Sequence, residues 1–409
     1  LAYTLFFNKK MAAALQRGRE DMGEINAQAE DTLSAIRMVQ SFGNEAVEAQ
    51  KFHVRNEKFL ESRKRGYKGE ALCYGGMDAF ASLIPIAVVV AGGFSILSGS
   101  LELSELVVFL LYVGYFTQPI QSLVNTSRLI QEGRTGLRRY MEILETQPEI
   151  TDAPGAGELP AVKGDIQFSH VDFRYGEGDQ VFQDLNLTIR AGEYVALVGA
   201  SGVGKTTLCS LIPRFYDVTK GRILVNGRDV RDVTQHELRA RIGYVPQRGV
   251  LFSGTIESNL KYGGDSISNR DMEQAAQIAQ ATEFIGAKPD GYQSEISQGG
   301  GNVSGGQKQR LSIARAIAKH PEIYIFDDSF SALDYKTDVA LRKELKEKTA
   351  GATVLIVAQR ISTILHAEQI IVLDEGKIVG KGTHEELLQS CEVYQQIALS
   401  QLSKEELGK

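Results

Sequence analysis

The stretch "EYVALVGASGVGKTTLCSLI", residues 193–212, joins an apolar run to a glycine-rich turn and then to a second apolar run. Gly199, Gly204, Lys205 and Thr206 stand in the GxxxxGK[ST] spacing, in which backbone N–H groups wrap phosphate groups. The lysine reaches the outer phosphates, and the threonine hydroxyl helps to hold Mg²⁺. Because a strand is expected before the turn and a helix after it, the stretch predicts an α/β domain that binds a nucleotide at a helix N-terminus.

A second stretch, "IYIFDDSFSALD" at residues 323–334, runs from bulky apolar residues directly into two aspartates. The apolar run predicts a buried parallel strand, so Asp327 at its carboxyl end is placed to reach the Mg²⁺ shell. Asp328 would then lie beside the γ-phosphate, where it could orient or deprotonate the attacking water. The alternative is an aspartate pair that only caps a helix, and the phosphate loop upstream favours the metal role for Asp327.

Three further pieces fit the same site. Gln247 ends the strand-like "RIGYVPQ", where its side-chain carbonyl could touch the metal or its water. Tyr175, in "VDFRYGEGD", could stack on a base, or it could be an ordinary core or surface tyrosine. The run "SGGQ" at residues 304–307 precedes a helix and suits an anion held at the helix N-terminus, although a turn that merely caps this helix has the same composition.

Two uncharged runs lie upstream of the nucleotide-binding part, at residues 79–101 and 106–127. Each exceeds the ~20 residues that a helix needs to cross a bilayer, although a buried helix of a large soluble protein is the alternative. The connection "GSLELSE" contains no Lys or Arg, whereas basic residues precede the first run and follow the second. These are Lys51, Arg55, Lys58, Arg63, Lys64, Arg65 and Lys68, then Arg128, Arg134, Arg138 and Arg139. The positive-inside rule therefore predicts a hairpin with both ends in the cytoplasm.

The segment at residues 9–70 is rich in helix-forming residues, with apolar residues such as Ile25 and Leu33 at helical spacing. Gly43 and Asn44 interrupt this pattern, which predicts two helices joined by a short turn. The chain begins with "LAYTLFF", without the charged region that precedes the apolar part of a signal peptide. We interpret these residues as the tail of an apolar segment whose beginning is missing, so the chain is expected to be a fragment.

The composition limits the possible partners and the number of domains. A chain of 409 residues is long enough for two or three domains. The formal net charge of -6 provides no basic surface for nucleic acid, so we expect no nucleic-acid partner. Cys73, Cys209 and Cys391 lie far apart and match no zinc or redox spacing, which indicates ordinary packed or solvated thiols.

Taken in order along the chain, these motifs resemble the nucleotide-binding domain of ATP-binding cassette (ABC) transporters. The membrane hairpin is similar to the last two transmembrane helices of an ABC exporter half, and "DTLSAIRMVQSFGNE" resembles its second cytoplasmic loop with the coupling helix. In that family a half has six transmembrane helices, so roughly the first three and most of the fourth are expected to be absent from this sequence. The resemblance implies a multi-pass protein of the cell (cytoplasmic) membrane, with its nucleotide-binding domain in the cytoplasm.

The resemblance also implies the fold class and the domain boundaries. Residues 1–145 are expected to form a partial α-helical transmembrane domain: the end of the fourth transmembrane helix, the coupling helix at about 32–44, the fifth helix at about 79–99 and the sixth at about 106–127. A linker follows at 146–164. Residues 165–402 are expected to form an α/β P-loop NTPase domain of ABC type, with an antiparallel β subdomain and a helical subdomain, before a tail at 403–409.

The residues expected to act can be grouped by role. The ATP contacts are Tyr175, Gly199, Ser201, Gly202, Val203, Gly204, Lys205, Thr206, Thr207 and Gln247. The Mg²⁺ ligands are Thr206, Gln247 and Asp327, and the catalytic positions are Asp328 and Gln359. The signature that faces a partner's ATP is Ser304, Gly305, Gly306 and Gln307, and the D-loop is Ser331, Ala332, Leu333 and Asp334. In the dimer that the resemblance implies, two ATP molecules lie head to tail, each between one phosphate loop and the other chain's signature.

Two positions depart from the family pattern, and both concern hydrolysis. The family has Glu after the strand aspartate and His in the switch loop, where this chain has Asp328 and, in "TVLIVAQRIST", Gln359. Aspartate is one methylene shorter, and a misplacement of ~1 Å can cost ~10²-fold in rate. Gln359 keeps a hydrogen-bonding group but not a titratable one. Because positioned acid–base groups contribute ~10²–10⁴-fold, a loss of ~10²-fold or more is expected.

Our first hypothesis is therefore an ATP-binding, slowly hydrolysing half of a heterodimeric exporter of a small apolar or amphipathic molecule, such as a drug, lipid or peptide. The intact signature would complete the site of a partner half that carries Glu and His. The second hypothesis is a homodimeric exporter in which Asp328 works slowly. The third, from another class, is a soluble or regulatory ABC ATPase, which the hairpin and the acidic balance disfavour.

Overall fold

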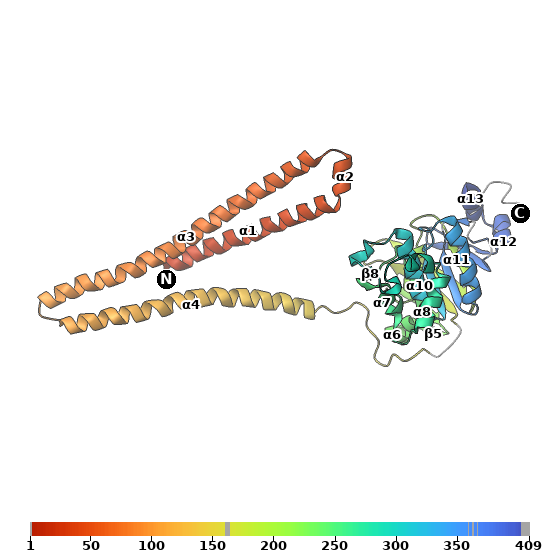
Figure 1. Cartoon of the computed structure of the whole chain (residues 1–409). Helices are drawn as coiled ribbons and strands as arrows, with labels where there is room; N and C mark the ends of the chain where they lie inside the picture. Colours follow the sequence, from red (N-terminus) through yellow and green to blue (C-terminus); the bar gives the residue numbers. More distant parts are fainter. Residues whose placement is uncertain (1, 160–163, 359, 362–363, 366, 402–409) are drawn as a thin grey trace. The chain divides into compact units, whose positions relative to one another are not determined.

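In a computed structural model, the chain divides into two compact units, Leu1–Gln147 and Pro148–Lys409 (Figure 1). The structure describes residues 2–159, 164–358, 360–361, 364–365 and 367–401. Some side chains of α1, α3 and α4 also lie outside the described set. Gln359 and the tail at 403–409, for which the sequence makes predictions, are outside the described residues.

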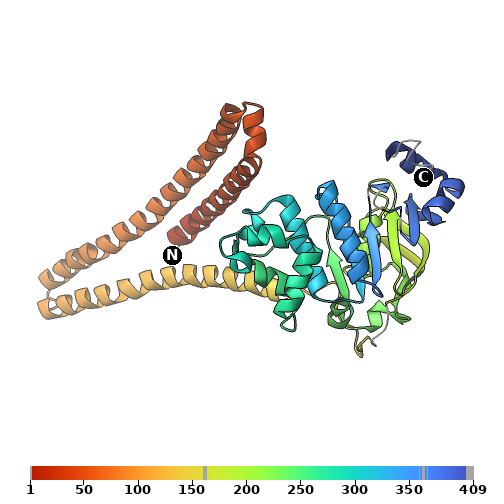
Figure 2. The same cartoon turned by 45° about the vertical axis from the view of Figure 1, so that its right-hand side comes forward.

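The first unit consists of helices. They are α1 (Ala2–Ser34), α2 (Ile36–Ser41), α3 (Glu45–Leu97) and α4 (Leu103–Leu144). Helices α1 and α3 run side by side, and the short α2 joins their ends (Figures 1 and 2). Gly43, with φ of +62°, lets the chain reverse after α2, since left-handed backbone favours glycine. The sequence predicts two helices joined by a turn here, and the structure adds the one-and-a-half turns of α2.

Charged and polar side chains join α1 to α3. Asp21 of α1 is buried, and its carboxylate accepts hydrogen bonds from the Ser62 hydroxyl at 2.5 Å and lies 3.2 Å from Lys58 Nζ of α3. The hydrogen bond from Ser62 lowers the pKa of Asp21, so the carboxylate stays charged. Lys58 also lies 3.1 Å from Glu24. Because a buried carboxylate must keep its partners, this group fixes how the two helices are aligned along their length.

Among the described residues, α3 is the one helix that is long and apolar enough to cross a membrane. Helix α4 carries a shorter apolar stretch at Leu103–Phe116, and many side chains between 117 and 132 lie outside the described set. A capping box at Glu102 and Glu105 begins α4, so the break between α3 and α4 falls within the predicted connection between the two apolar runs.

The second unit is built on a six-stranded sheet with the strand order β12-β11-β3-β10-β9-β6. All neighbours pair in parallel except the edge strand β12. The strands are β3 (Tyr194–Val198), β6 (Ile242–Val245), β9 (Ile323–Asp327), β10 (Thr353–Val357), β11 (Gln369–Asp374) and β12 (Lys377–Gly382). Every residue of β9 and β10 is buried, as expected for parallel strands covered on both faces.

Alternate residues of these strands face two different hydrophobic clusters. On one face, Val195 and Leu197 of β3 pack with the helix α5 (Lys205–Leu211) and the smaller antiparallel sheet. On the other face, Ala196 and Val198 belong to a cluster that also contains side chains of helices between residues 256 and 401. These helices include α7 (Ile256–Leu260), α8 (Asn269–Ile278), α10 (Gly305–Ala318), α11 (Tyr335–Lys348), α12 (His384–Ser390) and α13 (Glu392–Gln401).

The antiparallel sheet has the order β2-β1-β4-β5. Its strands are β1 (Ile166–Arg174), β2 (Gln180–Ile189), β4 (Lys220–Val225) and β5 (Arg228–Asp229). The remaining described elements are α6 (Gln235–Ala240), α9 (Thr282–Gly286), a pair of short strands, β7 (Gly254–Thr255) and β8 (Glu295–Ile296), and 3-10 turns at Val230–Asp232, Lys261–Gly263, Gly291–Gln293 and Gln298–Gly300. A helical membrane-type unit followed by an α/β domain with an antiparallel sheet and added helices is the fold class that the sequence predicts.

Gly221 in β4 lies in close contact with the backbone of the neighbouring strand β1. At Gly221, with φ of +78°, an added Cβ would lie 2.2 Å from the carbonyl oxygen of His170 and 2.5 Å from that of Ser169. Gly221→Ala combines left-handed strain with a backbone clash, so we expect a loss of ~2–5 kcal/mol in the free energy of unfolding. Gly227→Ala, at φ of +71° with nothing within 4 Å, adds strain alone and should cost ~1 kcal/mol. Equal unfolding midpoints in denaturant would contradict this account.

Candidate functional site

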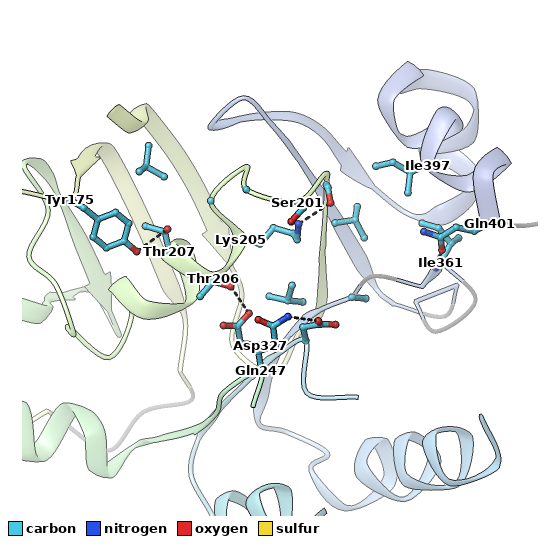
Figure 3. Close-up of a pocket in the computed structure, with 18 residues that line it drawn as sticks. Tyr175, Ser201, Lys205, Thr206, Thr207, Gln247, Asp327, Ile361, Ile397 and Gln401 are labelled. Atoms are coloured by element: carbon cyan, nitrogen blue, oxygen red, sulfur yellow. Dashed lines mark hydrogen bonds between the residues drawn. The ribbon is translucent and has the colours of Figure 1, made fainter. Parts of the chain in front are cut away.

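A cavity of about 500 Å³ opens at the carboxyl edge of the parallel sheet (Figure 3). The carboxyl ends of β3, β10 and β9 reach it, as does Gln247, two residues after the end of β6, and this edge is where open α/β sheets bind ligands. Most of the predicted ATP and metal residues line it, together with the predicted catalytic residue Asp328. They are Tyr175, Gly199, Ser201, Gly202, Gly204, Lys205, Thr206, Thr207, Gln247, Asp327 and Asp328. Val203 differs, because its side chain packs against the hydrophobic cluster of α5.

The loop between β3 and α5 is shaped by glycines that no other residue could replace without displacement. A Cβ at Gly199 would lie 2.2 Å from the carbonyl oxygen of Leu373, and one at Gly204 would lie 2.8 Å from the Phe182 ring. The Lys205 ammonium donates hydrogen bonds to the carbonyl oxygens of Gly199 at 2.8 Å and Ala200 at 2.6 Å. Burial lowers the pKa of Lys205, and the nearby carboxylates oppose this shift. The loop is therefore held in a curved form with its cation inside the curve.

Thr206, the second residue of α5, is hydrogen-bonded to Asp327 at the end of β9. The Thr206 hydroxyl donates to Oδ1 of Asp327 at 2.9 Å, and the Tyr244 hydroxyl donates to Oδ2 at 3.3 Å. Only 2% of the Asp327 surface is exposed, and burial raises the pKa of its carboxyl above the ordinary value of 3.8. Both oxygens of Asp327 thus have fixed donors before any ligand binds.

Asp328 is held by different contacts. The Gln247 amide donates to Oδ2 of Asp328 at 3.0 Å, and the Ser331 hydroxyl donates to the backbone carbonyl of Asp328 at 3.0 Å. The backbone of Asp328 is left-handed, with φ of +48°, a conformation that non-glycine residues adopt rarely and Asp or Asn most readily. An aspartate at position 328 is therefore compatible with this left-handed backbone conformation.

The oxygen donors of the cavity fit Mg²⁺. The described residues contain no cluster of three His, Cys, Asp or Glu side chains that could hold a metal ion by itself. Mg²⁺ does not need one, since it is usually held by one or two carboxylates together with substrate phosphates and waters. The Asp327 carboxylate, the Thr206 hydroxyl and the Gln247 amide oxygen are hard donors of this kind at one side of the phosphate loop.

Tyr175 lies at one end of the cavity, and Ile397 and Gln401 lie at the other end (Figure 3). Its hydroxyl donates to Thr207 Oγ1 at 3.0 Å, and its ring meets Tyr216 edge to face with centroids 5.0 Å apart. About 40% of the Tyr175 surface is exposed. A half-exposed ring fixed at its hydroxyl end offers a stacking surface to a planar group.

The four predicted signature residues, 304–307, are not among the described residues that line this cavity. Ser304 is the N-cap of α10 and forms a capping box with Gln307, in which each side chain accepts a hydrogen bond from the other residue's backbone N–H. The Ala332 carbonyl oxygen of the D-loop would lie 3.3 Å from a Cβ at Gly306, so these two segments are neighbours. Asp334 caps α11 through Thr337, and Leu333 is buried.

The C-terminal helix contributes residues that the sequence does not predict. Ile397 and Gln401 of α13 line the cavity, together with Ile361 (Figure 3). The Gln401 side-chain oxygen accepts a hydrogen bond from the Ile361 backbone N–H at 2.8 Å. No motif marks these residues, and only the amphipathic spacing of "EVYQQIALSQ" indicates a packed helix. Gln359, two residues before Ile361, lies outside the described residues.

Comparisons with known proteins agree with this geometry. The ABC transporter family model matches residues 182–331, and the model of the ABC transporter transmembrane region matches residues 1–120. The chain is 38% identical to an uncharacterized ABC transporter ATP-binding protein of Bacillus subtilis, YwjA, over 98% of this chain and 70% of that protein. It is 37% identical to an ATP-dependent lipid A-core flippase of Syntrophus aciditrophicus, over 98% of this chain and 67% of that protein.

A solved structure is also similar over nearly the whole chain. The structure of a bacterial Atm1-family ABC exporter with ATP bound superposes on this chain with a TM-score of 0.88 at 30% sequence identity. The match covers 98% of this chain and 71% of the exporter chain. The chain therefore belongs to the ABC transporter family. It is a membrane protein of the exporter type, in which a transmembrane region is fused to an ATP-binding domain that hydrolyses ATP. The third hypothesis, a soluble ATPase, does not agree with the transmembrane match.

The charge on Asp328 should destabilise the fold when no ligand is bound. Because burial raises its pKa, the folded chain binds this proton more tightly than the unfolded chain does. The stability that the protonated carboxyl contributes is fully present below the ordinary pKa of 3.8. This contribution is lost as the pH rises through the pKa of Asp328 in the folded chain. Asp328→Asn, which suits left-handed backbone, should therefore raise the unfolding temperature in EDTA at pH 7, and the gain should shrink toward pH 4.

Asp334 provides a control with the opposite sign. The hydrogen bonds from Thr337 lower the pKa of this exposed helix-capping carboxylate, so its contribution is present at neutral pH and is lost as the pH falls through the folded value. Asp334→Asn should lower or leave unchanged the unfolding temperature at pH 7. A loss of stability in Asp328→Asn at pH 7 would contradict the burial argument.

Proposed function

We propose that this chain is one half of a heterodimeric ABC exporter that binds ATP at its phosphate loop, cleaves it slowly, and supplies an intact signature to its partner's site. The observation that carries the proposal is Asp328. It stands where a catalytic carboxylate would act, yet its short side chain accepts from the Gln247 amide and its backbone is left-handed. A carboxylate that is one methylene short and already engaged is poorly placed to orient a water molecule.

The proposed roles follow the arrangement of the cavity. Tyr175 would stack on the base, the backbone N–H groups of residues 199–207 would wrap the phosphates, and Lys205 would turn from its own loop to the β and γ oxygens. Thr206, Gln247 and Asp327 would hold Mg²⁺, which neutralises the charge that develops on the transferred phosphoryl group. Asp328 and Gln359 would occupy the catalytic and switch positions, where the family pattern has the Glu and His side chains that support fast hydrolysis.

The signature and the D-loop would act on the partner's nucleotide. Ser304 and Gln307 cap each other at the start of α10, a helix of 14 residues whose N-terminal N–H groups attract anions. Because Gly305 and Gly306 carry no side chains, the backbone is open to a phosphate brought by another chain. The predicted D-loop, residues 331–334, lies between Asp328 and α11. A movement at this chain's ATP site would therefore be transmitted through the D-loop to the partner's ATP site.

We propose an apolar or amphipathic cargo, such as a drug, a lipid or a peptide. Support comes from the apolar wall of α3 and α4 and from the similarity to a protein named as a lipid A-core flippase. The domain limits predicted from the sequence, with spans at about 79–99 and 106–127 and a cytoplasmic nucleotide-binding domain at 165–402 in the cell membrane, belong to the same proposal. The charged side chains that join α1 to α3, including Asp21 and Lys58, suit the aqueous side.

A homodimeric exporter is the second candidate. The observation that favours it is the complete set of ATP-binding residues and the intact signature within one chain, so two copies could form two equal sites. In that dimer Asp328 would be the working carboxylate of both sites, and ATP turnover would not depend on another half.

Lengthening the carboxylate distinguishes these candidates. We expect Asp328→Glu, alone or with Gln359→His, to raise the ATP turnover of the purified chain by ~10-fold or more, because a positioned general base contributes ~10²–10⁴-fold. Steady-state phosphate release, measured with and without the partner half, tests this. Asp328→Asn is the matched control and should not exceed the unmodified chain. If the unmodified chain alone hydrolyses ATP rapidly, and Asp328→Glu does not increase this rate, the slow-site proposal is wrong and the homodimer is favoured.

A further inference from the structure

Tyr244 stands within "RIGYVPQ", where the sequence analysis gives a role only to Gln247, and its hydroxyl contacts Asp327. It belongs to β6, the edge strand that pairs with β9, and it stands three residues before Gln247. Its ring meets Phe215 edge to face with centroids 5.4 Å apart, and it packs against the hydrophobic cluster of α5. The Arg239 guanidinium in turn covers the Phe215 ring at 5.4 Å. The Tyr244 ring is therefore fixed by its neighbours on two sides.

The strand register brings the hydroxyl of this ring to the end of β9. Tyr244 is paired with Ile325, two residues before Asp327 on the neighbouring strand. Residues two apart on a strand point to the same face, so the phenol extends along β9 toward the aspartate. Its hydroxyl donates to Oδ2 of Asp327 at 3.3 Å, while Oδ1 accepts from Thr206 at 2.9 Å. The two donors come from different elements and hold the two oxygens separately.

Tyr244 is not among the described residues that line the nucleotide cavity, so it could influence a bound ion only through Asp327. We propose that Tyr244 is a positioning residue for the Mg²⁺ site: its hydroxyl fixes the rotation of the Asp327 carboxylate and thereby tunes how tightly the metal binds with ATP. This inference rests on the proposed role of Asp327 as a metal ligand. Hydrogen-bonded partners of ligating carboxylates have this effect in metal sites generally, and their loss typically costs 10–100-fold in metal affinity or activity.

Removing only the hydroxyl tests the inference. Tyr244→Phe keeps the ring and its packing on Phe215 but leaves Oδ2 of Asp327 without this donor. We measure binding of a fluorescent ATP analogue to the full chain while Mg²⁺ is titrated. The expected result is a ~10-fold rise in the Mg²⁺ concentration at half-maximal effect, with unchanged binding of the analogue in EDTA. Electron paramagnetic resonance of free Mn²⁺, in place of Mg²⁺, reports metal binding without any need for turnover.

Tyr324→Phe is the matched control. Tyr324 is buried on β9, opposite Gly243, and no described residue forms a hydrogen bond with its hydroxyl. Removing this hydroxyl changes the same sheet without touching Asp327, so the Mg²⁺ midpoint should stay at the value of the unmodified chain. The unfolding temperature of both variants in EDTA shows whether either loses stability.

Asp327→Asn separates failure of this inference from failure of the proposed metal site. If Asp327→Asn raises the Mg²⁺ midpoint and Tyr244→Phe leaves it unchanged, the tyrosine has no positioning role and this inference alone is wrong. If neither variant changes the midpoint, Asp327 is not a metal ligand, and both the inference and the proposed metal assignment are wrong. A lower unfolding temperature of Tyr244→Phe with an unchanged midpoint would also overturn the inference, since it would indicate a purely structural hydroxyl.

Discussion

The hydrogen bond from Thr206 to Asp327 joins the two parts of the chain on which the nucleotide site depends. Thr206 is the second residue of α5, the helix that follows β3, and Asp327 ends β9, with β10 between these strands. Val357 of β10 is paired with Leu197 on one side and with Asp327 on the other, so the three strand ends lie in one row. Because both faces of the sheet are buried, the polar side chains of the site lie at the ends of the strands. A shift of one residue in the pairing of β9 with β10 would turn Asp327 to the other face of the sheet, away from Thr206.

The sequence predicts this arrangement where physical rules leave few choices. A continuous apolar run such as "IYIF" can be satisfied only by a strand covered on both faces, and the glycine spacing of the phosphate loop fixes the turn that follows β3. The break between α3 and α4 follows similarly from polar residues between two apolar runs. These features are encoded in neighbouring residues, so they can be recognised without any knowledge of the tertiary structure.

Other parts of the site depend on contacts between distant residues and could not be predicted. The contact of Gln401 with the backbone of Ile361 joins positions 40 residues apart, and nothing in either segment indicates the other. Tyr244 looks like any partly buried residue of a short strand, because its contact with Asp327 arises only from the register of β6 and β9. The left-handed backbone of Asp328 is equally absent from the sequence pattern, since an aspartate adopts this conformation only where the surrounding strands and hydrogen bonds impose it.

The contacts of Lys205 have a thermodynamic consequence for the ligand. Its ammonium already has two carbonyl partners within its own loop, at 2.8 and 2.6 Å, so it is not a bare charge that waits for phosphate. An arriving triphosphate must exchange these bonds for its own, and the loop carbonyls must find water or other donors in return. The heat released on nucleotide binding should therefore be smaller than a count of new phosphate contacts suggests. A loop that satisfies its own lysine is more ordered before binding, which lowers the entropic cost of closing around the ligand.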